Sequence, residues 1–295
     1  MRALLEAMVR GLGVGSVYAL LALGFVIIYK ATQVISFAQP AFMLAGAVLV
    51  TYLVGPAGFW VAVPLAALGT AVLALGVERV VVRPMVGKPA FVVAIITLGV
   101  DVALRVVVNG FIGTDVRQVR DPWGLETVTL AGLQVEQRHI AMLVTATALV
   151  AALFAFFRYT RMGLAMRAAS YDQEAALAQG VSVGAVFALS WALAGGLAAV
   201  AGTFAAVGSS VDGSLWLIAL IALPVIILGG LDSLPGAVVG GLMVGLVQEV
   251  TAIYQEDWPS WFGGNFSVVT PYVLMMLVLL FRPYGLFGTR EVERV

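Results

Sequence analysis

The chain has 295 residues, of which 62% are hydrophobic and only 11% are charged, whereas an ordinary soluble domain carries about 25% charged residues. This composition excludes a water-soluble globular protein. The 16 Lys and Arg residues balance the 16 Asp and Glu residues, so the chain lacks the net positive charge of a nucleic-acid-binding protein. Because there is no Cys and a single His, His139, we expect no disulfide and no metal site on this chain.

The apolar residues form long runs between the charged ones. No charged residue occurs between Lys30 and Glu78, or between Glu174 and Asp212. Because about 20 apolar residues cross a bilayer as a helix, we predict an all-α polytopic membrane protein with about nine transmembrane or partly re-entrant helices. These helices are expected at residues 11–29, 34–54, 58–82, 90–112, 139–157, 183–207, 215–229, 235–254 and 266–281.

The seventh expected helix, 215–229, is short for a membrane span, and a Gly- and Pro-containing segment, 229–236, joins it to the eighth. The two could be full spans, or half-helices that enter and leave the same membrane face. Either way the number of complete crossings is odd, so the termini lie on opposite sides. The first apolar run is longer than the core of a signal peptide, and we expect it to be retained. We therefore predict one transmembrane domain over residues 1–295.

Lys and Arg are unequally divided between the two sets of loops, and the basic side of a membrane protein is normally cytoplasmic. We therefore predict the N-terminus outside and the C-terminus in the cytoplasm. The loop at about 113–138 is then external, and the loop at about 158–182 is cytoplasmic. The richer side holds Lys30, Arg79, Arg83, Lys88, Arg158, Arg161, Arg167, Arg282, Arg290 and Arg294; the other side holds Arg2, Arg10, Arg117, Arg120 and Arg138.

Glycines recur at a spacing of four residues in two of the expected helices, as Gly11 with Gly15, as Gly236 with Gly240, and as Gly241 with Gly245. Such pairs allow two helix backbones to approach closely. They predict helix contacts and are uninformative about a substrate.

Polar residues interrupt the second expected helix. Pro40 has no backbone N–H, which would leave the carbonyl group of Ser36 without its helical donor. That carbonyl group, beside Phe37 and Gln39, could bind a polar solute that crosses the membrane. The alternative is an ordinary helix start, or a proline kink that a neighbouring helix satisfies.

The fourth expected helix carries Asp101, Arg105 and Asn109 at steps of four residues, which places all three on one helix face. Because ionisable groups are costly in hydrocarbon, this face should point into the protein or into a wet cavity. The three side chains could line a translocation path. The alternative is a structural ion pair within the helix that fixes it against its neighbours.

The cytoplasmic loop has basic residues before acidic ones. Asp172 to Gln179 could form a short helix closed by Gly180, suited to a groove on another protein. A solvated loop without a partner is the alternative.

The sequence of this loop also resembles a motif of a known protein family. Glu174-Ala175-Ala176 followed by Gly180 resembles the EAA-x-x-x-G loop by which permease subunits of ATP-binding-cassette (ABC) importers engage their ATPase. The fuller stretch is similar to the branched-chain amino acid permease family, and Gly15–Leu20, Ile35–Gln39 and Gly229–Ala237 resemble further segments of that family. The resemblance assigns ATPase docking to Arg161, Gly163, Arg167, Asp172, Glu174, Ala175, Ala176 and Gly180.

The resemblance implies a permease subunit of an ABC importer in the cytoplasmic (inner) membrane of a prokaryote, surrounded by the lipid bilayer. It implies two ATPase subunits, a second homologous permease or a copy of this chain, and an extracytoplasmic solute-binding protein as partners. ATP and Mg would bind the ATPase subunits. The chain has no Gly-x-x-x-x-Gly-Lys phosphate loop, so we expect no cofactor and no enzymatic activity here.

The transported solute is implied to be a branched-chain or related amino acid. However, Gln39-Pro40 replaces the family's common His-Gly, and Asp232 replaces a Gly, so urea or short amides are an alternative. An ion-coupled secondary transporter, with Asp101 as its ion site, is a further alternative. An intramembrane hydrolase is disfavoured because the chain contains no Gly-x-Ser-x-Gly sequence.

Overall fold

The computed structural model describes residues 2–113, 117–124, 126–130, 132–255, 258–259 and 264–289. Within these residues, seven helical segments are long and apolar enough to cross a membrane. The predicted all-α polytopic fold is thus confirmed. The seven segments are α1 (Arg2–Thr32), α2 (Gln39–Ala57), α3 (Phe59–Val77) with its continuation to Met85, α4 (Ala90–Ile112), α5 (Gln137–Tyr159), α8 (Val183–Ala206) and α11 (Leu234–Tyr254). Arg290 and Arg294, which were counted among the basic residues of the expected cytoplasmic side, lie outside the described residues.

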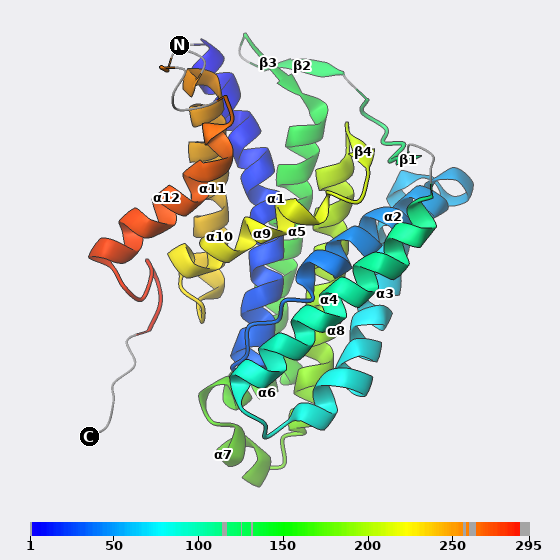
Figure 1. Cartoon of the computed structure of the whole chain (residues 1–295), viewed down its shortest axis with the longest axis vertical. Helices are drawn as coiled ribbons and strands as arrows, with labels where there is room; N and C mark the ends of the chain where they lie inside the picture. Colours follow the sequence, from blue (N-terminus) through cyan, green and yellow to red (C-terminus); the bar gives the residue numbers. More distant parts are fainter. Residues whose placement is uncertain are drawn as a thin grey trace.

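Helix α1 forms the centre of the bundle (Figure 1), and it contacts α11, α8 and α5. Its residues from Gly15 to Ile28 are all buried. The contact with α11 is made where Gly11 and Gly15 meet Gly241 and Gly245, whereas the third predicted pair, Gly236 and Gly240, faces α10. A Cβ atom on Gly15 would lie 2.7 Å from the carbonyl oxygen of Gly241, and Gly245 packs against the backbone of Gly15 and Gly11. The glycine spacing therefore marks a real helix contact at the core.

Gly15→Leu is expected to lower the free energy of unfolding by about 3 kcal/mol, because a side chain cannot fit between the two backbones. Denaturant unfolding of the purified protein in detergent measures the change. Gly76→Leu is the matched control, since nothing lies within 4 Å of a Cβ atom at Gly76 on α3. Equal stability of the two variants would show that close approach of α1 and α11 is not needed.

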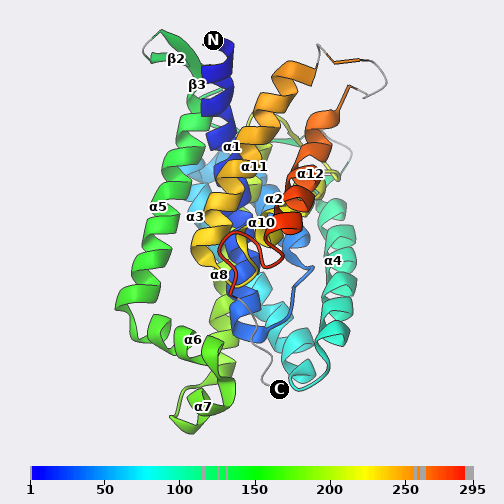
Figure 2. The same cartoon turned by 90° about the vertical axis from the view of Figure 1, so that its left-hand side faces the viewer.

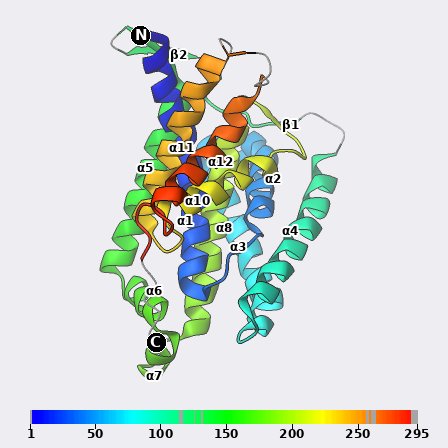
Figure 3. The same cartoon turned by 60° about the vertical axis from the view of Figure 1, so that its left-hand side comes forward.

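Helix α2 begins at Gln39, so the predicted helix over 34–54 was wrong at its start. Ser36 and Phe37 lie in a non-helical segment that runs from the end of α1 to the start of α2 near mid-height of the molecule (Figure 3). Pro40 lies in the first turn, where its missing N–H costs nothing and its fixed φ favours the helix. Pro40 was expected either to start a helix or to kink one, and in the structure it lies at the start of a helix.

The seventh expected helix consists of two short ones, α9 (Trp216–Leu220) and α10 (Ala222–Gly229). Figure 1 shows them lying across the middle of the molecule, after which α11 begins. The last helix, α12 (Phe266–Phe281), has 16 residues and is also shorter than a full span. Among the described residues, seven membrane-length segments, the α9–α10 segment (Trp216–Gly229) and α12 therefore account for the nine expected helices.

The two ends of the bundle differ. At the end where α1 begins, β2 (Thr127–Leu130) and β3 (Leu133–Glu136) form an antiparallel hairpin. β1 (Arg117–Gln118) pairs with β4 (Ser210–Val211). At the opposite end, α6 (Arg161–Tyr171) and α7 (Gln173–Ala178) follow α5. The described parts of the segments 113–138 and 158–182 thus lie at opposite ends, because the single membrane-length helix α5 separates them.

The described part of the 113–138 loop is anchored to the helices. Trp123 packs edge-on against Phe59, with ring centroids 5.0 Å apart, and stacks on Phe204. The backbone N–H of Gln134 donates to the carboxylate of Glu6 on α1, at 3.0 Å. The hairpin is therefore held close to the first turns of α1.

Candidate translocation path and docking segment

The ion pair on α4 is formed within one helix. The guanidinium of Arg105 lies 2.7 Å from the carboxylate of Asp101, one turn away. Asp101 is buried, and the same guanidinium stacks 3.9 Å from the ring centroid of Trp216. The pair therefore also links α4 to α9, one of the two short helices in the middle of the bundle.

The polar face of α4 extends in both directions from this pair. One turn earlier, the buried hydroxyl of Thr97 accepts a hydrogen bond of 3.0 Å from the backbone N–H of Phe37. Two turns after Asp101, Asn109 is exposed at the surface of the helix. The sequence argument missed Thr97, although its spacing of four residues from Asp101 could have identified it. The polar face of α4 thus extends from its contact with the non-helical segment before α2 to the surface of the bundle.

Gln39, the first residue of α2, is completely buried. Its side chain lies against Gly24 of α1, near the backbone of Ala194 on α8. Within the described part of the chain, neither its amide nitrogen nor its amide oxygen has a hydrogen-bond partner. An unpaired buried amide costs about 1–3 kcal/mol, so Gln39 is a polar group that a bound polar molecule could satisfy.

The other candidate path residues near Gln39 have different surroundings. Ser36 is buried, and its hydroxyl accepts from the N–H of Ala38 at 3.4 Å. Pro40 is buried and Phe37 is half-buried. The structure therefore brings Phe37 to the α4 face through its backbone, whereas Ser36 and Pro40 shape the start of α2.

The predicted short helix after Asp172 is present as α7. The Asp172 carboxylate accepts from the N–H of Ala175 at 2.9 Å and caps the first turn. Gly180 has φ +83°, and the N–H groups of Gly180 and Val181 donate to carbonyl groups of the last turn. Gln173 donates from its side chain to the carbonyl of Ala31, at 2.9 Å, which attaches α7 to the end of α1.

Helix α6 precedes α7 and was not predicted from the sequence. Thr160 caps it by accepting from the N–H of Gly163, at 2.9 Å. Gly163 itself is buried because α6 folds back onto the end of α5, where a Cβ atom would lie 2.7 Å from the Cα atom of Phe157. Among the candidate docking residues, Gly163 and Ala176 are buried, and the exposed ones are Arg161, Arg167, Asp172, Glu174, Ala175 and Gly180.

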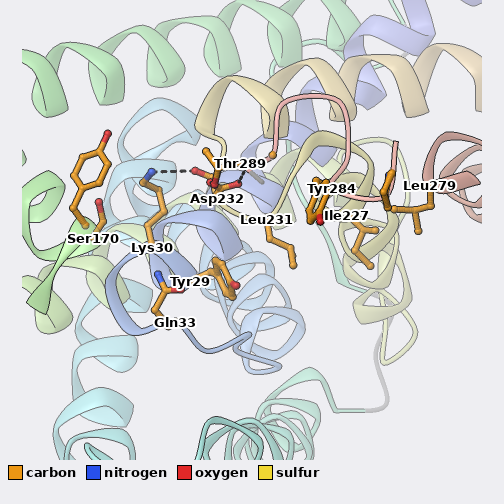
Figure 4. A pocket seen from close by; sticks show the side chains of 13 residues that line it. Tyr29, Lys30, Gln33, Ser170, Ile227, Leu231, Asp232, Leu279, Tyr284 and Thr289 are labelled. Atoms are coloured by element: carbon orange, nitrogen blue, oxygen red, sulfur yellow. Dashed lines mark hydrogen bonds between the residues drawn. The ribbon is translucent and has the colours of Figure 1, made fainter. Parts of the chain in front are cut away.

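A cavity of about 490 Å³ lies between the end of α1, α6, the α10–α11 turn and the segment after α12 (Figure 4). The ammonium group of Lys30 donates to the backbone carbonyl of Asp232, at 3.0 Å. The Asp232 carboxylate accepts from both the N–H and the hydroxyl of Thr289. Asp232, which replaces the Gly of the family that the sequence resembles, therefore contacts the C-terminal segment through its side chain.

The C-terminal segment is further attached through its backbone. The N–H groups of Leu286 and Phe287 donate to the carbonyl groups of Leu228 and Gly229, at 2.8 and 3.0 Å. The sequence argument did not identify this contact, because the apolar pattern ends at α12. The segment fixes the turn between α10 and α11.

The chain resembles known transport proteins over almost its full length. The family model described as "Branched-chain amino acid transport system / permease component" matches residues 7–281. The high-affinity branched-chain amino acid transport system permease protein BraD of Pseudomonas aeruginosa is 28% identical over 309 residues, which cover 99% of this chain and 98% of that protein. The corresponding protein LivH of Escherichia coli (strain K12) is 28% identical over 312 residues, which cover 99% and 97%.

A solved structure shares the fold. It is an inward-facing conformation of an ABC transporter described as of the metal-chelate type, with a TM-score of 0.54 and 17% identity, covering 94% of this chain and 84% of that chain. At this identity the likeness concerns the fold alone. Because the family model matches far more than half of the chain, the protein belongs to the branched-chain amino acid transport system permease family.

Proposed function

We propose that this chain is the membrane-spanning subunit of an ABC importer that carries branched-chain or related amino acids across the cytoplasmic membrane. As a permease subunit it is a transport protein rather than an enzyme. ATP and Mg²⁺ are then bound by separate ATPase subunits. The names of its relatives BraD and LivH support the choice of solute. The assembly we propose contains two ATPases, a second homologous permease or a copy of this chain, and an extracytoplasmic solute-binding protein.

In the proposed orientation the N-terminus is outside, and the C-terminus and the segment 158–182 are cytoplasmic. Helix α7 then docks in a groove of an ATPase subunit. The exposure of Glu174 and Ala175, and of Leu177 with 61% of its surface accessible, supports this role. The hydrogen bond from Gln173 to Ala31 provides a direct connection from the docking segment to the central helix. The β2–β3 hairpin and the loop around it would receive the binding protein.

One observation carries the proposed path: α4 has membrane length, and yet Arg105, about two turns before its end, keeps part of its guanidinium exposed, on the same face as the exposed Asn109. A polar side chain facing lipid is costly. The face from Thr97 to Asn109 is therefore proposed to line a wet path, which the second permease closes from the other side. Asp101 and Arg105 carry the charges complementary to the ammonium and carboxylate groups of an amino acid.

The lack of cysteine allows a direct test of this path, because a single introduced thiol has no background. Asn109→Cys is expected to react with a membrane-impermeant maleimide, since maleimides react with thiolates in water. Val107→Cys on the same helix, where Val107 is 58% exposed, should remain unlabelled because it faces lipid. Labelling is measured by mass spectrometry in membranes that contain the assembled transporter. Equal protection of both thiols would contradict a wet path along α4.

Transport measurements test the solute and the source of energy. Proteoliposomes that contain this chain and its partners should accumulate labelled leucine only when ATP is supplied to the ATPase side. Uptake of urea in preference to leucine would favour the amide alternative, for which the unpaired amide of Gln39 is the specific observation. Uptake by this chain alone, driven by an ion gradient, would overturn the proposal.

A further inference from the structure

Two hollows join beside the bend between α5 and α6. Figure 2 shows α5 on the outside of the bundle, with α6 turning inward from its end. The larger hollow, of about 580 Å³, is lined by Phe154, Ala155 and Arg158 of α5 together with Arg167 and Leu234. The smaller one, of about 130 Å³, shares Arg167 and Leu234 and reaches Lys30 at the end of α1. Together they form one groove, which we call the elbow groove.

All the charged side chains of the elbow groove are positive. Arg158, Arg167 and Lys30 line it, and none of the described residues that line it is acidic. Among the residues that the structure describes, neither Arg158 nor Arg167 forms an ion pair with a carboxylate. Two unpaired guanidinium groups beside an apolar wall match a ligand with an anionic head and an apolar body.

The level of the groove in the membrane agrees with a ligand that has an anionic head and an apolar body. Arg158 lies in the last turn of α5, a helix of membrane length, so its guanidinium reaches the level of the lipid head groups. Phe154 and Ala155 lie one turn further into the membrane, at the level of the acyl chains. From the membrane surface inward, the groove is first positively charged and then apolar. This is the order of head groups and acyl chains in the adjacent lipid leaflet.

We propose that the elbow groove binds an anionic phospholipid. The phosphate group lies between Arg158 and Arg167, and an acyl chain follows Ala155, Phe154 and Leu234. Basic pockets between membrane helices bind anionic head groups in this manner. The lipid then supports the bend from which α6 leads to α7. This inference requires only that α5 spans the membrane, and it holds whatever solute the transporter carries.

Native mass spectrometry of the purified protein measures this binding with phosphatidylglycerol and phosphatidylcholine at equal concentrations. Phosphatidylglycerol should be retained preferentially, and Arg158→Gln should reduce its affinity by about fivefold. Arg79→Gln is the matched control, because Arg79 is an exposed arginine at the same end of the bundle and lies outside the groove. Arg158→Lys should retain the preference, which separates loss of charge from misfolding. Equal retention of the two lipids by the unsubstituted protein, or equal losses in Arg158→Gln and Arg79→Gln, would overturn the proposal.

A second pair of variants tests the apolar part of the groove. Ala155→Trp fills the groove and should lower the retention of phosphatidylglycerol. Ala152→Trp adds the same side chain at an exposed position of α5 that does not line the groove, and it should have no effect. If Ala155→Trp instead separated two permease subunits without changing lipid retention, the groove would be a protein interface and the lipid proposal would be wrong.

Discussion

Gly180→Arg is expected to lower the solute-stimulated ATP hydrolysis of the assembled transporter by about 10- to 100-fold, the range of a typical coupling free energy. Gly180 ends α7 with φ +83°, a conformation that a side chain with a Cβ atom adopts at a cost of about 1–2 kcal/mol. The variant therefore loses the closed last turn and also places a long cation on the proposed docking surface. ATP hydrolysis is measured with and without the solute-loaded binding protein.

The controls separate docking from insertion. Gly180→Asn should retain most of the stimulation, because Asn tolerates the left-handed conformation. The amount of Gly180→Arg protein in the membrane should be unchanged, since α7 lies outside the membrane-length helices. Full solute-stimulated hydrolysis by the Gly180→Arg complex would refute a docking role for α7.

Arg105→Leu is expected to lower the free energy of unfolding by about 3 kcal/mol, because it leaves the buried carboxylate of Asp101 without its partner. The variant also removes the cation that stacks on Trp216. Denaturant unfolding in detergent gives the stability, and uptake into proteoliposomes gives the transport rate. A loss of transport is expected together with the loss of stability.

The double variant Asp101→Leu/Arg105→Leu distinguishes the two roles of the pair. Removing both charges relieves the unpaired carboxylate, so stability should recover. Transport should stay low if the pair lines the path. A double variant that is stable and transports at the normal rate would show that the pair is only structural.

The helices could be predicted where apolar residues predominate over several consecutive helical turns. The predicted 90–112 coincides with α4, and 266–281 coincides with α12. The start of α2 could not be predicted, because the same amino-acid sequence is compatible with a proline in the first turn of a helix and with a proline that kinks a longer helix. Helix α6 was missed because it carries Arg161, Arg167 and Ser170 and lies outside the long apolar runs.

The candidate site was predictable only along single helices. Steps of four residues placed Asp101, Arg105 and Asn109 on one face, and the ion pair follows from that spacing. The contacts of Arg105 with Trp216 and of Asp232 with Thr289 join residues far apart in sequence. No local pattern contains such pairs, because the packing of separate helices decides which of them meet.

The central place of α1 has a consequence for the biogenesis of the protein. Helix α1 is synthesised well before α11, and yet its glycine face is covered by Gly241 and Gly245 of that later helix. Until the ribosome has made α11, α1 must wait in the membrane with that face against lipid or against the insertion machinery. The core therefore closes only after α11 has been made, and α1 waits longer than the helices between them for its full set of neighbours.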